Sequence, residues 1–417
     1  MSPAARKPPR VQKYGGTSVG SPARLRKVAR RIAQCVDDGD ECIVVVSAMG
    51  KTTDDLVALA QEITPSPSGR EYDMLLATGE IVSSALLALA LRELGHPAIA
   101  LTGAQAGVNT DDTFNRARIT SVDTARIRQE LKRDHVVIIA GFQGMSSDSD
   151  FTTLGRGGSD TSAVALAAAI DAERAEIYTD VDGVFTTDPR IERNARKLHD
   201  IAYEEMLELA AQGAGIMHPR AVELGLLHDV PILVASSFND DVPGTLIRRQ
   251  VEMEPTNRVR GVALDADVAA ITVRAVPDRP GIAAQIFGPL ADDGVSVDTI
   301  VQNASVERLT DLTFTVAHDD WRKAKEITDS VATSLDAGEV IVNHDLAKVS
   351  IVGTGMQSGV GYAATMFRAL AAAEINVQEI TTSEIRITVL VAAESGESAV
   401  RVLHEAFQLD EPANLPT

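Results

Sequence analysis

The last third of the sequence contains an internal repeat, and this repeat limits the fold more strongly than any other feature. The segment that begins at Ile271 resembles the segment that begins at Val349, and an offset of 80 residues pairs Gly281 with Gly361. Each copy reads as a strand, a glycine-containing loop, a helix, two strands and a helix, the pattern of a ferredoxin-like βαββαβ unit. The second copy ends in its helix with only a polar tail beyond it, so we expect the two copies to share or exchange a strand.

Ahead of the repeat, short apolar runs alternate with segments of helical period, which is the pattern of βαβ units around a parallel sheet. In Arg24 to Val36 the apolar residues recur at helical spacing, and Ser21 and Pro22 suit the N-cap and first helical positions. We therefore expect an α/β fold in which helices sandwich a mostly parallel sheet. The other expected elements are strands at Val11 to Tyr14, Ile43 to Ser47, Val136 to Phe142, Ala175 to Thr179 and Pro231 to Ala235, and helices at Glu71 to Leu94 and Ser159 to Ile170.

A change of composition near residues 250–260, which are polar and poor in strand formers, separates this α/β part from the repeat. It predicts five parts of the chain. They are a disordered N-terminal arm at 1–10, a catalytic domain at 11–249, a linker at 250–265, and two small domains at 266–345 and 346–417.

Charge and cysteine content exclude several classes of protein. The chain has 39 basic and 59 acidic residues, a formal charge of −20, and such a surface repels the phosphate backbone of nucleic acid. The apolar stretches are shorter than the roughly 18 residues of a membrane span, and no apolar stretch follows the basic start, so we expect a cytoplasmic protein. Cys35 and Cys42 are too few for a disulfide framework, and we interpret them as buried structural thiols.

The first glycine-rich motif joins a strand to a helix near the N-terminus. Lys13 ends the strand, and Gly15 and Gly16 form a turn whose backbone N–H groups could approach a phosphate, with Lys13 as a mobile cation. No Walker-type G-x-x-x-x-G-K-[ST] loop occurs. The simpler interpretation is a tight turn. The segment Gly16 to Gly20 also matches the G-x-S-x-G elbow of serine hydrolases, but it follows the first strand, which disfavours that alternative.

The second motif, at Gly155 to Gly158, precedes a helix whose first turn carries Ser159 and Asp160. It lacks the third glycine of a dinucleotide fingerprint. Arg156 could bind a carboxylate through its planar fork, and the N–H groups of the glycines could stabilise developing charge. Asp160 would orient lysines or act through a metal, and the alternative is capping of the helix.

The third motif lies where the strand that ends at Thr179 passes into Asp180. Ligands of α/β sheets bind beyond the carboxyl ends of the strands, so Asp180 could face Mg²⁺ or a nucleotide and Arg190 the phosphates. A plain turn is the preferred interpretation for Asp182 and Gly183.

Together, the motifs KYGGTS, GRGGSD and YTDVDG-x-x-TTDPR, followed by tandem small domains, resemble the aspartate kinases of the amino acid kinase family, whose repeats are ACT domains. GRGGSD and the Thr-Asp strand end also have counterparts in acetylglutamate, glutamate and uridylate kinases. The resemblance covers nearly the whole chain. It implies ATP-dependent phosphorylation of the side-chain carboxylate of aspartate, the first step toward lysine, threonine and methionine.

The resemblance also implies roles for individual residues. Lys13 would stabilise the transferred phosphoryl group, Asp160 would organise the catalytic cations, and Arg156 would bind the α-carboxylate of aspartate. The ATP site would comprise Lys13, Tyr14, Gly15, Gly16, Ser47, Thr179, Asp180, Phe185 and Arg190. The aspartate site would comprise Thr53, Glu80, Arg156, Gly157, Gly158 and Ser159, with Glu80 on the amino group.

Cofactors and partners follow from the same resemblance. Mg²⁺ would arrive with ATP rather than in a site of protein ligands, and lysine, threonine or both would act as effectors. In the first repeat, Asp298 could bind an ammonium group, N–H groups near Gly281 a carboxylate, and Gln302 a polar side chain. A homo-oligomer through the ACT domains is expected, and an internal start near Met253 could yield a separate regulatory chain. The effector residues would be Asp278, Gly281, Ile282, Ala283, Ser296, Val297, Asp298, Gln302, Asn303, Asn376, Val377, Ser383 and Glu384.

Three positions depart from the family pattern. Gly215 stands where a lysine is common, Ala235 stands where an arginine is common, and the second repeat reads GMQSGVGYAA where relatives usually have a His-Pro-Gly step. Arg190 or Arg220 could replace the lysine. Two alternatives stay open: a regulatory amino-acid-binding protein without kinase activity, and another amino acid kinase.

Overall fold

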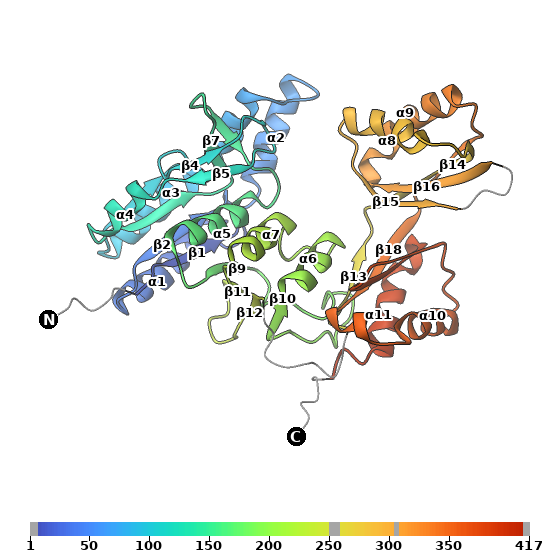
Figure 1. Cartoon of the computed structure of the whole chain (residues 1–417). Helices are drawn as coiled ribbons and strands as arrows, with labels where there is room; N and C mark the ends of the chain where they lie inside the picture. Colours follow the sequence, from blue (N-terminus) through green and yellow to red (C-terminus); the bar gives the residue numbers. More distant parts are fainter. Residues whose placement is uncertain (1–6, 250–258, 304–307, 412–417) are drawn as a thin grey trace. The chain divides into compact units, whose positions relative to one another are not determined.

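The computed structural model describes residues 7–249, 259–303 and 308–411, so residues 1–6 of the expected arm at 1–10, residues 250–258 of the expected linker at 250–265 and the internal start at Met253 lie outside the described residues. The end of the expected arm is ordered, because Arg10 begins the first strand. The chain forms two compact units (Figure 1). The first unit comprises Met1–Phe185, Lys197–Ala211 and Gly215–Glu254. The second unit comprises Thr186–Arg196, Gln212–Ala214 and Pro255–Thr417.

An eight-stranded sheet forms the centre of the first unit, in the order β10-β12-β11-β9-β1-β2-β6-β3. Its central strand β1 (Arg10–Tyr14) pairs in parallel with β2 (Cys42–Val46) and β9 (Ala175–Thr179), so that Lys13 lies opposite Val45 and Ile177. Only β12 runs antiparallel to a neighbour, β11. The sheet is therefore mostly parallel, as expected. The remaining strands are β3 (Ala98–Leu101), β6 (Val136–Ala140), β10 (Asp200–Ala202), β11 (Ile232–Ser236) and β12 (Thr245–Arg248).

Helices cover both faces of this sheet, which confirms the predicted sandwich. The helix α1 (Pro22–Asp37) begins as expected, because Ser21 Oγ accepts a hydrogen bond from Arg24 N at 3.3 Å. Apolar side chains of α1 and α3 (Arg70–Glu93) share one core with the sheet, while α5 (Gly158–Ile170) packs against β1, β2 and β9. The other helices of this unit are α2 (Thr52–Ile63), α4 (Ala125–Leu131), α6 (Tyr203–Ala211) and α7 (Pro219–His228).

The helix α3 was expected at Glu71 to Leu94 and has that length, but it is more apolar than we expected of any segment. Its 24 residues include a window with a mean hydropathy of 1.9, which by length and composition alone could cross a membrane. Half of that window is buried inside the protein, and Leu87 and Leu91 are fully buried in the core beneath the sheet. This packing is that of a core helix, whose inner face must be apolar.

A second, smaller sheet in the first unit was not anticipated. It has the order β5-β4-β7-β8, with β4 and β5 ahead of β6 in the chain and β7 and β8 after it. The expected strand to Phe142 stops at Ala140 because Phe142 has a φ of 66°, a left-handed conformation that ends the extended backbone. Its strands are β4 (Val108–Thr110), β5 (Ile119–Val122), β7 (Gln143–Met145) and β8 (Phe151–Thr153).

The second unit contains one four-stranded antiparallel sheet for each repeat. The first has the order β15-β16-β14-β17 and carries α8 and α9, and the second has the order β13-β18-β20-β19 and carries α10 and α11. The elements of the first repeat are β14 (Ala269–Pro277), α8 (Ile282–Asp292), β15 (Val297–Gln302), β16 (Leu309–Val316), α9 (Trp321–Ser334) and β17 (Val340–Asn343). Those of the second are β18 (Leu346–Val352), α10 (Tyr362–Ala372), β19 (Glu379–Thr382), β20 (Arg386–Ala392) and α11 (Gly396–Ala406).

The fourth strand of the second sheet comes from ahead of the first repeat. The strand β13 (Gly261–Asp265) lies in the stretch expected to be a linker, and it pairs antiparallel with β18, with Gly261 opposite Val352 and Asp265 opposite Lys348. Both sheets thereby gain a fourth strand, β17 in the first and β13 in the second. In the sequence, the first repeat therefore lies between two parts of the second sheet, namely β13 before it and the strands from β18 onward after it.

Two short segments from the sequence of the α/β part also belong to the second unit. Residues 186–196 contact the second repeat through Thr186, whose carbonyl accepts from Val262 N at 2.7 Å and whose hydroxyl lies 2.9 Å from His404 Nε2. Gln212 accepts a hydrogen bond from Ser350 Oγ at 3.1 Å. The described part of the second unit is therefore larger than its two repeats.

Candidate active site

The candidate site lies in the first unit, at the carboxyl ends of the central strands. The chain leaves β1 to one side toward β2 and returns on the other side as β9, which is the switch point where α/β sheets bind ligands. Lys13 is near the end of β1 and Thr179 ends β9, so the first and third motifs lie side by side. Gly15 N donates a hydrogen bond to Tyr178 O at 3.1 Å, which links the two strand ends.

Lys13 and Asp160 join the first motif to the second. The Lys13 side chain is largely buried, and its Nζ lies 2.5 Å from Asp160 Oδ1 in the first turn of α5. The attraction within this ion pair is strengthened because partial burial lowers the local dielectric constant. The structure therefore brings together the two charged residues that the sequence singled out independently.

Both glycine turns offer backbone N–H groups that other parts of the described chain do not use. In the first turn, the N–H groups of Gly16 and Thr17 have no hydrogen-bond partner among the described residues, and the same is true of Gly157 and Ser159 in the second. A Cβ atom on Gly16 would lie 2.8 Å from Ala48 O, so only glycine fits there. Free N–H groups near a lysine form a site for an anion.

Glu80 is the most perturbed acid of the site. Its carboxylate is buried, Oε1 accepts a hydrogen bond from Ala48 N at 3.0 Å, and Oε2 has no hydrogen-bond partner in the described part of the chain. Burial raises the pKa of Glu80 to about 7, although the Ala48 N–H and the Lys13 charge oppose the rise. A buried oxygen without a partner is costly, so this position suits a cationic ligand.

Beside the second motif is a pocket with several arginines. It has a volume of about 790 Å³, and Arg156, Arg116, Arg118 and Arg220 all line it, together with His218. The Arg220 guanidinium donates to the carbonyl oxygens of Leu154 and Ala117, so it holds these two segments together. Arg156 is exposed and can bind an anionic group.

Two predicted ATP-site residues are placed differently from expectation. The Tyr14 side chain is fully buried and stacks on Tyr178 with ring centroids 5.0 Å apart, so only its backbone faces the strand end. Arg190 belongs to the second unit, and its guanidinium pairs with Asp188 at 2.6 Å.

The other predicted residues follow the ends of β2 and β9 along the chain. Ser47 N donates to Tyr14 O at 3.1 Å, and Thr53 is half-buried in the first turn of α2. Asp180 is exposed and accepts a hydrogen bond from the Thr179 hydroxyl at 3.2 Å. Phe185 is the last residue of the first segment of this unit, where it bridges to Lys197.

Comparison with known proteins agrees with these motifs. Residues 8–236 match the amino acid kinase family, and residues 270–332 and 349–407 each match an ACT domain. An aspartate kinase from Pseudomonas putida is 47% identical over 404 residues, which cover 97% of this chain and 98% of that protein. This chain belongs to the aspartate kinase family.

Solved structures of the family have the same fold. The crystal structure of E. coli aspartokinase III in complex with aspartate and ADP has a TM-score of 0.80, is 28% identical, and is matched over 95% of this chain and 99% of that chain. The same enzyme in complex with lysine and aspartate has a TM-score of 0.74 at 28% identity, over 96% of this chain and 99% of that chain.

In the first ACT domain, the predicted effector residues form a loop and the strand beside it. Gly281 has a φ of 92° and precedes α8, and Asp298 and Gln302 are exposed on β15. Asp298 Oδ2 lies 2.7 Å from Lys348 Nζ of β18, and Asp265 Oδ2 lies 3.2 Å from the same atom. The carboxylate expected to receive an ammonium group therefore already holds one, supplied by the second ACT domain.

Several residues of the site were not predicted. Asp73 is fully buried and accepts hydrogen bonds from the N–H groups of Asn115 and Thr153, which ties these two segments to α3. Arg116 and Arg118 line the arginine-rich pocket. A signal was present in the sequence, because the segment FNRAR carries two arginines beside polar residues in an acidic chain.

Proposed function

We propose that this protein transfers the γ-phosphoryl group of ATP to the side-chain carboxylate of L-aspartate, giving ADP and 4-phospho-L-aspartate. The observation that carries the proposal is the Lys13–Asp160 pair at 2.5 Å, which joins two glycine turns whose N–H groups have no partner among the described residues. A carboxylate nucleophile needs no general base, so catalysis reduces to aligning two anions and neutralising their repulsion. Lys13 and the N–H groups supply that neutralisation.

The first glycine turn suits the phosphates of the nucleotide. Lys13 would neutralise the transferred group, the N–H groups of Gly16 and Thr17 would bind phosphate oxygens, and the absence of a side chain at Gly16 leaves room for close approach. Asp160 and Asp180 are the carboxylates placed to support Mg²⁺ held by those phosphates. When bound, Mg²⁺ neutralises charge that develops on the phosphate oxygens.

The second turn and its surroundings suit aspartate. Glu80 Oε2, a buried oxygen that lacks a partner among the described residues, would accept the ammonium group. Arg156 would bind the α-carboxylate, and the N–H groups of Gly157 and Ser159 would orient the reacting carboxylate. In the E. coli relative solved with aspartate and ADP, the same fold binds both ligands, which supports this assignment.

Regulation and assembly are part of the same proposal. Lysine, threonine or both would inhibit by binding at the ACT loops, and the E. coli relative in complex with lysine supports this for lysine. The chain would act in the cytoplasm at the first step toward lysine, threonine and methionine. It would form a homo-oligomer through its ACT domains, with a regulatory chain from an internal start near Met253 as a further product.

The decisive test measures acyl phosphate, trapped as a hydroxamate, with ATP and aspartate, glutamate or N-acetylglutamate in parallel. We expect product with aspartate alone, and a loss of several orders of magnitude in kcat for Lys13→Ala and Asp160→Ala in folded protein. Lys132→Ala is the matched control, because Lys132 is an exposed lysine after α4. No product with any acceptor would indicate a regulatory protein, and product with another acceptor would indicate another amino acid kinase.

A further inference from the structure

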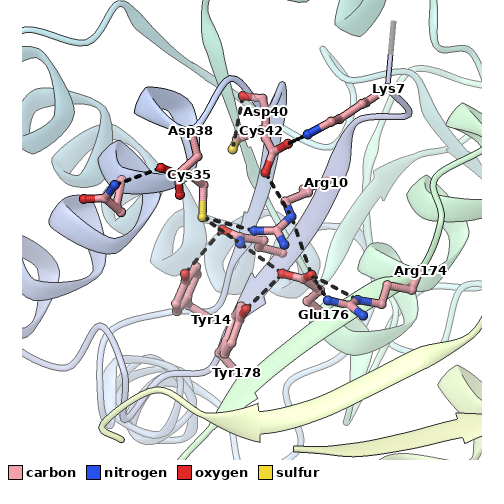
Figure 2. A network of polar contacts seen from close by, with 12 residues as sticks. Lys7, Arg10, Tyr14, Cys35, Asp38, Asp40, Cys42, Arg174, Glu176 and Tyr178 are labelled. Atoms are coloured by element: carbon pink, nitrogen blue, oxygen red, sulfur yellow. Dashed lines mark hydrogen bonds and ion pairs between the residues drawn. The ribbon is translucent and has the colours of Figure 1, made fainter. Parts of the chain in front are cut away.

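The chain's two cysteines meet at a place that the proposed reaction does not use. Cys35 lies in the last turn of α1 and Cys42 begins β2, and both are free and buried. Figure 2 shows the two side chains in one polar network with Arg10, Glu176 and Tyr178. Both cysteines belong to one hydrophobic core, Cys42 lies opposite Arg10 in the sheet, and the Cys42 thiol donates to Asp40 O at 3.8 Å.

Cationic and amide donors surround the Cys35 sulfur. Arg10 Nη1 donates to Cys35 Sγ at 3.4 Å and Gln12 Nε2 at 3.7 Å. Hydrogen bonding from Cys42 and Gln12 and the charge of Arg10 outweigh burial and lower the pKa of Cys35 to about 6. The same contact and burial raise the pKa of Cys42. One sulfur is thus stabilised as a thiolate while its neighbour keeps its proton, the arrangement of an attacking and a resolving thiol.

One of the two cysteines borders a pocket, and the other keeps a small part of its surface exposed. Cys35 retains 9% of its surface exposed, and Cys42 lines a pocket of about 480 Å³ together with Gly39, Asp40 and His135. The loop between the cysteines is short and turns at Gly39, where φ is 87° and no atom lies within 4 Å of a Cβ position. The space around Gly39 is therefore open, although Asp40 beside it pairs with Lys7 and Arg10.

We propose that Cys35 and Cys42 are a redox-modifiable pair that a peroxide converts to an intramolecular disulfide. The Cys35 thiolate attacks one peroxide oxygen, the O–O bond breaks, and Cys35 becomes a sulfenic acid as the second oxygen leaves as hydroxide and takes up a proton. The Cys42 sulfur then attacks the Cys35 sulfur, and the hydroxyl group leaves with the Cys42 proton as water. Overall, two thiols lose two hydrogen atoms and one hydrogen peroxide becomes two waters.

Formation of the disulfide would also change the hydrogen bonds around the two cysteines. Gln12 Nε2 also donates to Glu176 Oε2 at 3.0 Å, and Glu176 accepts from the Tyr178 hydroxyl at 2.9 Å. A disulfide would take away the anionic sulfur that Arg10 and Gln12 share. Because the proposal concerns only these thiols, it stands or fails independently of phosphoryl transfer to aspartate.

The test treats reduced, full-length protein with one equivalent of hydrogen peroxide, quenches it, and counts thiols in denaturant. We expect the count to fall from two to none, with a mass lower by about two units, restored by dithiothreitol. In Cys42→Ser, dimedone should label Cys35. In Cys35→Ser, Cys42 should stay reduced at the same dose. Arg10→Met should slow the oxidation of the wild-type pair several-fold.

Three results would overturn the proposal. They are retention of both thiols in the wild type, equal labelling of the two single-cysteine variants, and disulfides between chains on non-reducing gels. Circular dichroism of each variant checks that it is folded. If either serine variant is unfolded, the wild-type thiol count, the mass and the Arg10→Met rate still decide the question.

Discussion

A Cβ atom on Gly157 would lie 2.1 Å from the Cβ atom of His218, so the second glycine turn and the start of α7 touch directly. Gly157 also has a φ of 68°, which residues with a side chain rarely adopt. His218 is the N-cap of α7, and burial and Arg220 lower its pKa. The turn that carries the free N–H groups is therefore held in place by a contact that only glycine allows.

Gly157→Ala should distort this turn. The left-handed backbone costs an alanine about 1–2 kcal/mol, and overlap with His218 adds about 1–3 kcal/mol, while misplaced N–H groups should lower kcat by about a hundredfold. Gly95→Ala is the matched control, because Gly95 has a φ of 89° with no atom within 4 Å of its Cβ position. Thermal unfolding and the hydroxamate assay measure both effects. Equal losses in the two variants would show that the His218 contact has no role.

Glu80→Gln should separate ligand binding from stability. The pKa of Glu80 is raised from 4.5 to about 7 in the folded protein, so the unfolded chain loses this proton at lower pH than the folded one. The wild type therefore loses stability as pH rises from about 4.5 to 7, by about 3 kcal/mol in all. The variant should be more stable than the wild type at pH 8 and not at pH 4.

The same variant should bind aspartate less tightly. Only ionised Glu80 attracts an ammonium group, so the wild-type KM for aspartate should fall as pH rises through about 7, and this dependence should vanish in Glu80→Gln. Loss of a charge-assisted hydrogen bond should raise KM about ten- to a hundredfold at pH 8. An unchanged KM would place the ammonium group elsewhere.

Gly215→Lys should supply the cation that the family resemblance led us to expect at this position. One added charge-assisted contact should lower the KM for ATP about ten- to a hundredfold. Gly215 has a φ of 62°, so the variant should also lose about 1–2 kcal/mol of stability. Gly215→Gln has the same backbone strain without the charge and is the control. Equal KM values for the two variants would mean that the lysine does not reach the phosphates.

Lysine, threonine or both should inhibit the wild type, because an effector that binds the inactive state more tightly shifts the population toward it. Gln302→Ala should raise the concentration for half inhibition about tenfold, the effect of losing one hydrogen bond of about 1.4 kcal/mol. Glu326→Ala, an exposed residue of α9, is the control. If neither amino acid inhibits, alone or combined, the proposed effector site is contradicted. That result is expected if the ACT repeats serve only for dimerisation.

The main parts of the fold follow from local sequence. The strand β9 has the expected bounds, and Ser21 caps α1 as expected, because strand formers and capping groups act over a few residues. The meeting of Lys13 with Asp160 also follows, since parallel strands present their carboxyl ends at one edge.

The remaining parts depend on contacts between distant residues. Asp73 binds Asn115 and Thr153 across 42 and 80 positions, and no local pattern announces such a pairing. Tyr14 belongs to the same motif as Lys13, yet alternation along β1 turns its side chain into the opposite core. The ion pair of Asp298 was not predicted for the same reason, because its partner Lys348 lies in the other repeat.

The position of β13 in the sequence affects when the second ACT domain can complete its sheet during synthesis. Its residues leave the ribosome first, but their partner strand β18 begins about eighty residues later, after the whole first ACT domain. The first domain has all its strands before β18 appears and can fold early, whereas β13 must wait as an unpaired strand. An ACT fragment would need to start before Gly261 to contain every strand of both sheets. A fragment that starts at Ala269 would expose the edge of β18 and invite pairing with another chain.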